Sequence, residues 1–170
     1  MADYTKVASY DVRTLIWNQL KAEGLFTESD YYADGFNVPL IPIIPAQQVP
    51  EFNNLLPGKA FIIYDVAQKA GNIQWWMTQE SMNFEVTSTS SSEIQTIINF
   101  LTDMFRRYDE SARESNLQIS SSSPFTFHFF RVDGADPIQS FQNEGSYMAG
   151  TLTISYAYTR ALHPTTGKYL

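Results

Sequence analysis

Apolar residues recur every three or four positions along residues 9–22, so that one helical face is apolar: Val12, Leu15, Ile16 and Leu20. Polar side chains such as Arg13, Asn18 and Lys21 occupy the remaining surface. Gly24 follows this segment and can adopt the left-handed backbone that ends many helices. The spacing predicts an amphipathic helix over residues 9–22.

A second helix signal begins at the serines of residues 90–92. Ser90 and Glu93 have the spacing of a capping box, in which the serine hydroxyl accepts a helical N–H and the carboxylate reaches back to the cap. The apolar positions that follow repeat at intervals of three and four: Ile94, Ile97, Ile98, Leu101, Met104, Phe105 and Tyr108. We expect one long amphipathic helix with this stripe buried, ending between residues 109 and 114.

Two strands are expected between these helices. Residues 60–66 are apolar on both faces, which favours a position inside a sheet. The next strand is expected to begin near Trp75 and Trp76 and to continue, or restart after a break, to residue 87. Its later half alternates, so that Met82, Phe84 and Val86 point one way and the residues between them point the other. Residues 70–72 have the composition of a turn that joins the two strands.

Two further strands are expected after the second helix. Residues 125–132 place Phe125, Phe127 and Phe129 on one side and Phe130 with His128 on the other. Residues 133–137 read as a turn. The last strand covers residues 147–162, and its inward positions are Leu152, Ile154, Tyr156 and Tyr158.

Residues 36–58 show no period and form a Pro-rich segment. Each proline removes a backbone hydrogen-bond donor and favours extended geometry in the residue before it. The prolines of this segment are Pro39, Pro42, Pro45, Pro50 and Pro57. We expect an extended apolar arm that cannot pair fully in a sheet. Two interpretations of the arm stand side by side: it packs on the core of its own chain, or it docks on a partner.

The order of elements predicts an α+β fold in one domain, residues 1–170. A mostly antiparallel sheet of about four or more strands packs against two amphipathic helices. The Pro-rich arm, residues 36–58, and a loose C-terminal tail, residues 163–170, complete the expected organisation.

Composition narrows the function classes. Apolar residues make up 44% of the chain and aromatic residues 15%, which indicates a packed globule with aromatic surface to spare for an interface. The net charge is −7 and the longest basic run is Arg106–Arg107, a poor basis for wrapping DNA. There is no cysteine, so disulfides and thiolate chemistry are excluded.

The sequence shows no pattern typical of an enzyme or of a cofactor site. His128 and His163 are the two histidines, they are far apart, and neither lies in a metal-binding motif. Gly58–Lys59 lacks the other residues of a phosphate-binding loop. We therefore expect no catalysis, no metal and no cofactor. We also expect no signal peptide and no membrane contact, because no run approaches the ~18 apolar residues that span a bilayer.

The expected function is contact with other protein chains, made by the arm, by the paired tryptophans and by the strand at residue 130. On a strand, two adjacent tryptophans point to opposite faces, so one can enter the core and the other can anchor an interface. The candidate contact residues are Phe36, Val38, Leu40, Ile41, Ile43, Ile44, Phe52, Trp75, Trp76, Phe130 and Arg131.

Three segments of this layout resemble the tail terminator (tail completion, minor tail protein U-like) family of long-tailed bacteriophages. They are residues 11–16 (DVRTLI) in the first helix, residues 82–86 (MNFEV) leading into residues 92–94 (SEI), and residues 150–156 (GTLTISY) in the last strand. The similarity is one of layout and covers about residues 9–160.

The resemblance implies a structural virion protein at the junction of tail and neck, assembled in the host cytoplasm. Such proteins form a homo-hexameric ring on the tail tube protein, stop tube polymerisation and join the head connector or neck proteins. In a contractile tail they also meet the sheath protein. DNA passes through the lumen of the ring without sequence-specific binding.

Two alternatives remain open. One is another neck or sheath-associated assembly protein of a phage or of a contractile injection system. The other, from a different class, is a small ligand-binding or enzymatic α+β domain with its pocket under the Pro-rich arm. Polar residues converging on a cavity would favour the second.

Overall fold

One five-stranded sheet organises the chain in the computed structural model, which describes residues 5–68, 76–140, 147–162 and 165–167. In chain order the elements are α1 (Ala8–Ala22), η1 (Glu28–Tyr31), β1 (Ile43–Pro45), η2 (Ala46–Gln48), α2 (Val49–Leu55), β2 (Phe61–Gln68), β3 (Thr78–Ser88), α3 (Ser91–Phe105), α4 (Asp109–Gln118), β4 (Phe125–Ser140) and β5 (Met148–Arg160). The predicted α+β class is confirmed. The expected turn at residues 70–72, Trp75 and most of the expected tail lie outside the described residues.

The strands lie in the order β1-β2-β3-β5-β4. β1 runs parallel to β2, and every other neighbouring pair is antiparallel. β2 therefore lies inside the sheet, as its apolar residues on both faces predicted.

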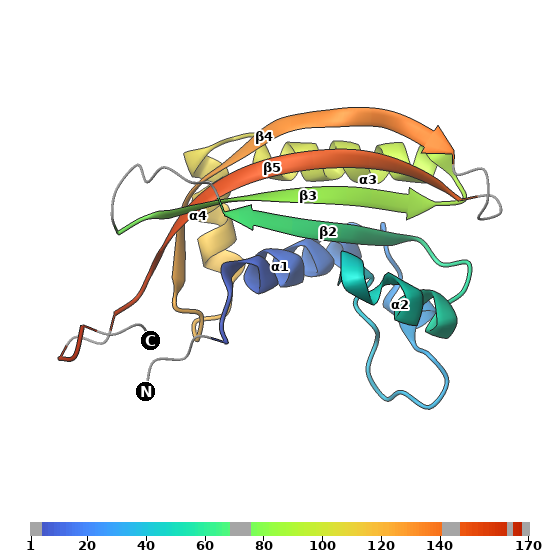
Figure 1. The fold of residues 1–170 in the computed structure, drawn as a ribbon, viewed down its shortest axis with the longest axis horizontal. Helices are drawn as coiled ribbons and strands as arrows, with labels where there is room; N and C mark the ends of the chain where they lie inside the picture. Colours follow the sequence, from blue (N-terminus) through green and yellow to red (C-terminus); the bar gives the residue numbers. More distant parts are fainter. Residues whose placement is uncertain (1–4, 69–75, 141–146, 163–164, 168–170) are drawn as a thin grey trace.

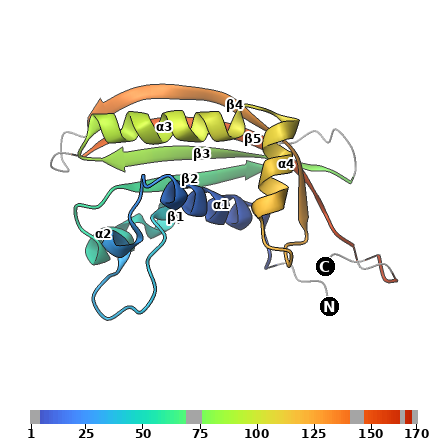
Figure 2. The same ribbon diagram turned by 180° about the vertical axis from the view of Figure 1, so that it is seen from behind.

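Helices cover one face of this sheet, and none of the helices in the described ranges lies on the other face. In Figure 1 the strands lie in front of α3, and in Figure 2, from behind, α3 lies in front of the strands while α1 lies alongside β2. The predicted alternation of β3 and β5 is confirmed: the side chains that face the helices are fully buried, among them Met82, Phe84, Leu152 and Ile154. We call the other surface of the sheet the open face.

The first helix begins and ends close to its predicted limits. Val12, Leu15, Ile16 and Leu20 are buried, which confirms the predicted stripe. Gly24 has φ of +69°, and the N–H of Leu25 donates to the carbonyl oxygen of Leu20 at 2.9 Å. A left-handed residue after the last turn directs the following N–H groups back to carbonyl oxygens that have no partner within the helix.

The second predicted helix is capped through one additional serine. Ser90 Oγ accepts a hydrogen bond from the N–H of Glu93 at 3.3 Å, as predicted. The Glu93 carboxylate, however, accepts from the Ser88 hydroxyl, and Ser88 Oγ accepts from the N–H of Ser90 at 3.1 Å. The carboxylate therefore acts on the cap indirectly.

The prediction of one long helix through residues 109–114 was wrong. α3 ends at Phe105, and α4 begins at Asp109 after a sharp turn at Tyr108. The carbonyl oxygen of Tyr108 accepts the N–H of Phe130 at 3.2 Å, so the chain leaves the helix to contact the edge of β4. Tyr108, predicted to be buried, is 50% exposed.

The predicted end of the fourth strand was also wrong. β4 continues to Ser140, so the turn expected at residues 133–137 is part of the strand. The strand contains bulges: Phe127 pairs with Tyr158 and Phe129 with Ala157, which leaves His128 as an extra residue. The extra residue reverses the later alternation, so Phe130 faces the helices and Phe129 lies on the open face.

Side chains from two helices satisfy backbone groups at both edges of the sheet. The Asn116 amide of α4 donates to the carbonyl oxygen of Phe127 at 2.8 Å and accepts from its N–H at 2.9 Å. At the opposite edge, Arg13 Nε of α1 donates to the carbonyl oxygen of Ile43 at 2.5 Å. Edge groups that are already satisfied do not recruit another strand.

A carboxyl group is buried on the helix side of the sheet. Glu80 is 8% exposed and accepts hydrogen bonds from the hydroxyls of Tyr156 and Tyr158, each at 2.7 Å. Burial first, and the neighbouring Glu80 second, raise the pKa of both tyrosines above the ordinary range. Both phenols therefore stay protonated as donors, and the cluster is a structural one.

None of the helices in the described part of the chain combines the length and the apolar character needed to cross a membrane.

Replacing Tyr156 by phenylalanine should lower the free energy of unfolding by about 1–3 kcal/mol, because it leaves the buried Glu80 with one donor fewer. Urea denaturation followed by circular dichroism measures the change. Tyr32→Phe is the matched control, since the Tyr32 hydroxyl contacts Glu28 at 3.3 Å in an exposed position. An equal loss in both variants would contradict the role assigned to Glu80.

Candidate interaction surface

Residues 32–58 form a lobe at one end of the sheet. Figure 1 shows its loop and α2 on the right, below the start of β2, while β1 joins the lobe to the sheet. The arm predicted here as extended is extended only in part, because Val49–Leu55 is a helix. Pro50 lies in the first turn of this helix, where a missing N–H removes no helical hydrogen bond.

The inner side of the lobe is fixed to the core. The N–H of Ile62 donates to the carbonyl oxygen of Pro42 at 2.7 Å, and Ile43 is completely buried. The rings of Phe52 and Phe61 lie 5.4 Å apart, which ties α2 to the start of β2. Of the two interpretations of the arm, packing on its own chain therefore holds for this inner side.

The outer side of the lobe exposes large apolar side chains. Val38 is 65% exposed, Phe36 45% and Tyr32 44%. These residues lie in the loop before β1, where Gly35 turns the chain with φ of +84°. Apolar side chains grouped on a projecting loop are typical of a protein contact.

The structure divides the predicted contact residues into two groups. Ile43, Ile44, Phe52 and Phe130 belong to the hydrophobic core of the subunit, so we remove them from the candidate surface contacts. Apolar composition alone could not distinguish them from contact residues. The remaining described candidates are exposed or half-buried: Phe36, Val38, Leu40, Ile41, Trp76 and Arg131.

Sequence reasoning missed three exposed aromatic residues, Tyr10, Tyr32 and Tyr108. Tyr31 and Tyr32 are adjacent, and the structure buries the first and exposes the second. Tyr108 continued the apolar spacing of α3, so its periodicity indicated the core.

A hollow of about 250 Å³ lies between the lobe and α1. Leu40, Ile41 and Phe52 are among its apolar lining residues, and Arg13 and Glu51 are its charged ones. Arg13 Nε already donates to the backbone of β1. The hollow is smaller than most small-molecule sites, which span about 300–1,000 Å³.

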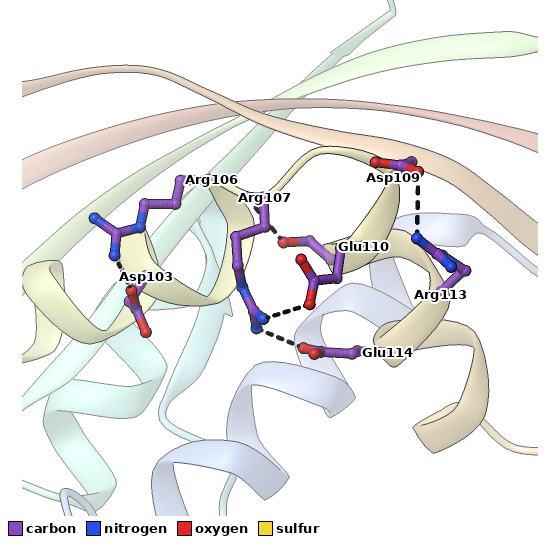
Figure 3. Close-up of polar contacts among 8 residues, drawn as sticks. Asp103, Arg106, Arg107, Asp109, Glu110, Arg113 and Glu114 are labelled. Atoms are coloured by element: carbon purple, nitrogen blue, oxygen red, sulfur yellow. Dashed lines mark hydrogen bonds and ion pairs between the residues drawn. The ribbon is translucent and has the colours of Figure 1, made fainter.

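Acidic and basic side chains gather where α3 meets α4 (Figure 3). The pairs are Asp103–Arg106 at 2.6 Å, Glu110–Arg107 at 3.1 Å, Glu114–Arg107 at 2.7 Å and Asp109–Arg113 at 3.4 Å. The hydrogen bond that Arg107 donates to Glu114 raises the pKa of Arg107 above its ordinary value. Exposed pairs of this kind contribute little to stability.

His128 lies on the open face. Its Nε2 lies 3.0 Å from Thr159 Oγ1, and its ring centre lies 6.0 Å from that of Trp76. Within the described ranges, no group of three or more His, Asp or Glu side chains could hold a metal ion. Trp76 lies in a turn before β3, which corrects the expected start of that strand.

Compared with known proteins, the chain matches no family model and no curated sequence.

Changing Ile43 to aspartate should unfold the subunit, because an unpaired carboxylate in a fully buried position costs about 4 kcal/mol or more. Val38→Asp should change the free energy of unfolding by no more than about 0.5 kcal/mol, since its side chain is largely exposed. Thermal melts of the two variants test this division of the lobe. A folded Ile43→Asp protein with an unchanged melting temperature would contradict it.

Proposed function

We propose that the protein is a structural assembly protein that acts as a closed ring of identical subunits. The observation that carries this proposal is the lobe, whose inner side is fixed to the core while Tyr32, Phe36 and Val38 are exposed on its outer side. An exposed apolar group on a rigid support is suited to burial against another chain, because little conformational entropy is lost on binding.

Ring formation requires that one surface of a subunit meets a different surface of the next. A projecting lobe at one end of the molecule suits such a head-to-tail contact better than a self-complementary one. At each edge a helical side chain bonds part of the edge backbone, at Ile43 of β1 and at Phe127 of β4, which favours association through side-chain surfaces over strand pairing at these positions.

The proposed setting is the neck of a long-tailed phage, where the ring acts as tail terminator. This setting rests on the resemblance carried by residues 11–16, 82–86 and 150–156, which lie in α1, β3 and β5. In that role the ring caps the tail tube protein, ends its polymerisation and receives the head connector, with sheath protein alongside in a contractile tail. The net charge of −7 suits a lumen through which DNA passes without being held.

The purified protein should form a ring of about six chains, with a mass about six times the 19.4 kDa of one chain. Light scattering after gel filtration measures the mass, and negative-stain microscopy shows the ring. Added to tail tubes, it should cap one end and stop their elongation. A protein that stays monomeric and leaves tube ends free would contradict the proposal.

Binding to a neck or sheath component, without capping of the tube, would instead favour another assembly role in the same structure.

A second candidate function is the binding of a small ligand in the hollow under the lobe, which at about 250 Å³ would take a molecule smaller than most such ligands. Arg13 and Glu51 lie at its wall beside apolar residues, an arrangement that combines charge with apolar contact. A thermal-shift screen tests this function directly. A ligand whose stabilising effect disappears in Glu51→Ala would establish it, and a screen without stabilising compounds would remove it.

A further inference from the structure

Aromatic side chains form a second exposed cluster on the open face, which we call the aromatic patch: Trp76, Tyr108, His128 and Phe129. The rings of Tyr108 and Phe129 are stacked, with centres 4.7 Å apart and planes within 1° of parallel. Trp76 contacts His128 edge to face at 6.0 Å. Phe129 is buried but does not belong to the hydrophobic core on the helix side. The patch is therefore a separate, ordered group of rings.

Two rings of this patch are available to a partner. Trp76 is 45% exposed and Tyr108 is 50% exposed, while His128 and Phe129 support them from below. Rigid aromatic side chains on an ordered base are the commonest anchors of protein interfaces, because few rotamers are lost when they are buried.

The backbone at Tyr108 is strained. Among the described residues, Tyr108 is the one non-glycine residue with a positive φ, at 53°, and its ψ is −110°. This conformation favours glycine, and a tyrosine there persists because the hydrogen bond to Phe130 and the stack on Phe129 hold it. Backbone strain of this kind is concentrated at functional positions, which is consistent with a role for the exposed ring.

The lobe and the aromatic patch lie at opposite ends of the sheet. β2 leaves the lobe at Phe61, which pairs with Thr87 near the end of β3, whereas Trp76 precedes the start of β3. The 11 residues of β3 separate the two surfaces by roughly 30 Å. Figure 1 shows the two ends, with α2 on the right and the start of β3 with α4 on the left.

The lobe is acidic, whereas the patch is bordered by a cation that is partly exposed within an ion pair. The charged residues of the lobe are Asp34 and Glu51, both acidic and both exposed. Beside the patch, Arg131 follows Phe129 on the same face of β4, and its side chain is 49% exposed although its Nε donates to Asp133. An acidic lobe meeting this arginine favours the correct orientation of two copies.

We propose that the lobe of one copy docks on the aromatic patch of the next copy, with Val38 and Phe36 against Trp76 and Tyr108. This inference rests on the proposed self-association and names its two surfaces. Because the surfaces differ and lie at opposite ends, each copy offers one donor lobe and one acceptor patch, and the contact repeats around a ring.

The experiment uses two variants that each destroy one surface. Val38→Asp removes the apolar contact of the lobe, and Trp76→Asp removes an anchor of the patch. Each should weaken self-association at least ~30-fold in sedimentation velocity, the effect expected for an interface anchor. Mixed together, the two variants should form a 1:1 dimer that grows no further, because one intact lobe still meets one intact patch.

Leu117→Asp is the matched control, since Leu117 is 86% exposed on α4 but belongs to neither surface. It should assemble as the wild type does. Circular dichroism melts should show that all three variants remain folded.

Other outcomes separate the two levels of the proposal. If either Val38→Asp or Trp76→Asp assembles like the wild type, or if their mixture stays monomeric, the assignment of these two surfaces is wrong while ring formation stands. If the wild type itself neither associates nor caps tail tubes, the proposed function is wrong and this inference falls with it.

Discussion

The pairing of β3 with β5 is the interaction on which the remaining structure depends. The two strands pair from Thr78 opposite Tyr158 to Ser88 opposite Met148. Side chains alternate between the faces, so a shift of one residue would move Met82 and Phe84 from the core to water. The core formed with α3 therefore fixes the register. With the register fixed, the positions of β2 and β4, and hence of the lobe and the aromatic patch, follow from their own pairing.

A finite sheet leaves backbone groups without strand partners at its two edges, and residues in or next to the helices bond some of these groups. Arg13 contacts β1, and Tyr108 with Asn116 contacts β4. Beyond these contacts, β4 carries bulges and the charged residues Arg131 and Asp136, which also discourage pairing with a foreign strand. The turn that brings Tyr108 to the edge also places its ring on the open face. The turn at Tyr108 therefore both protects part of the edge of β4 and forms part of the aromatic patch.

The fold could be predicted from the sequence wherever periodicity was regular. The buried face of α1, the cap at Ser90 and the alternation of β3 and β5 are local signals, and each was predicted. Features that depend on contacts between residues far apart in the sequence could not be predicted in this way. The bulge at His128 has no local signature, because it exists only relative to the register of β5. The end of α3 at Phe105 is a second feature that depends on a distant contact, because Tyr108 leaves the helical stripe to pair with Phe130. The candidate surface was predicted as a region, but burial within it was not.

The lobe separates folding from association within one short segment. Val38 and Ile43 are five positions apart, yet the first is largely exposed and the second is completely buried. Residues that pack inward hold the loop in place before any partner arrives, so binding orders little new chain. The residues that face outward contribute little to folding, so side chains that suit a partner can occupy these positions without loss of stability. This division between an anchored inner side and an exposed apolar outer side is the arrangement that the proposed self-association would require.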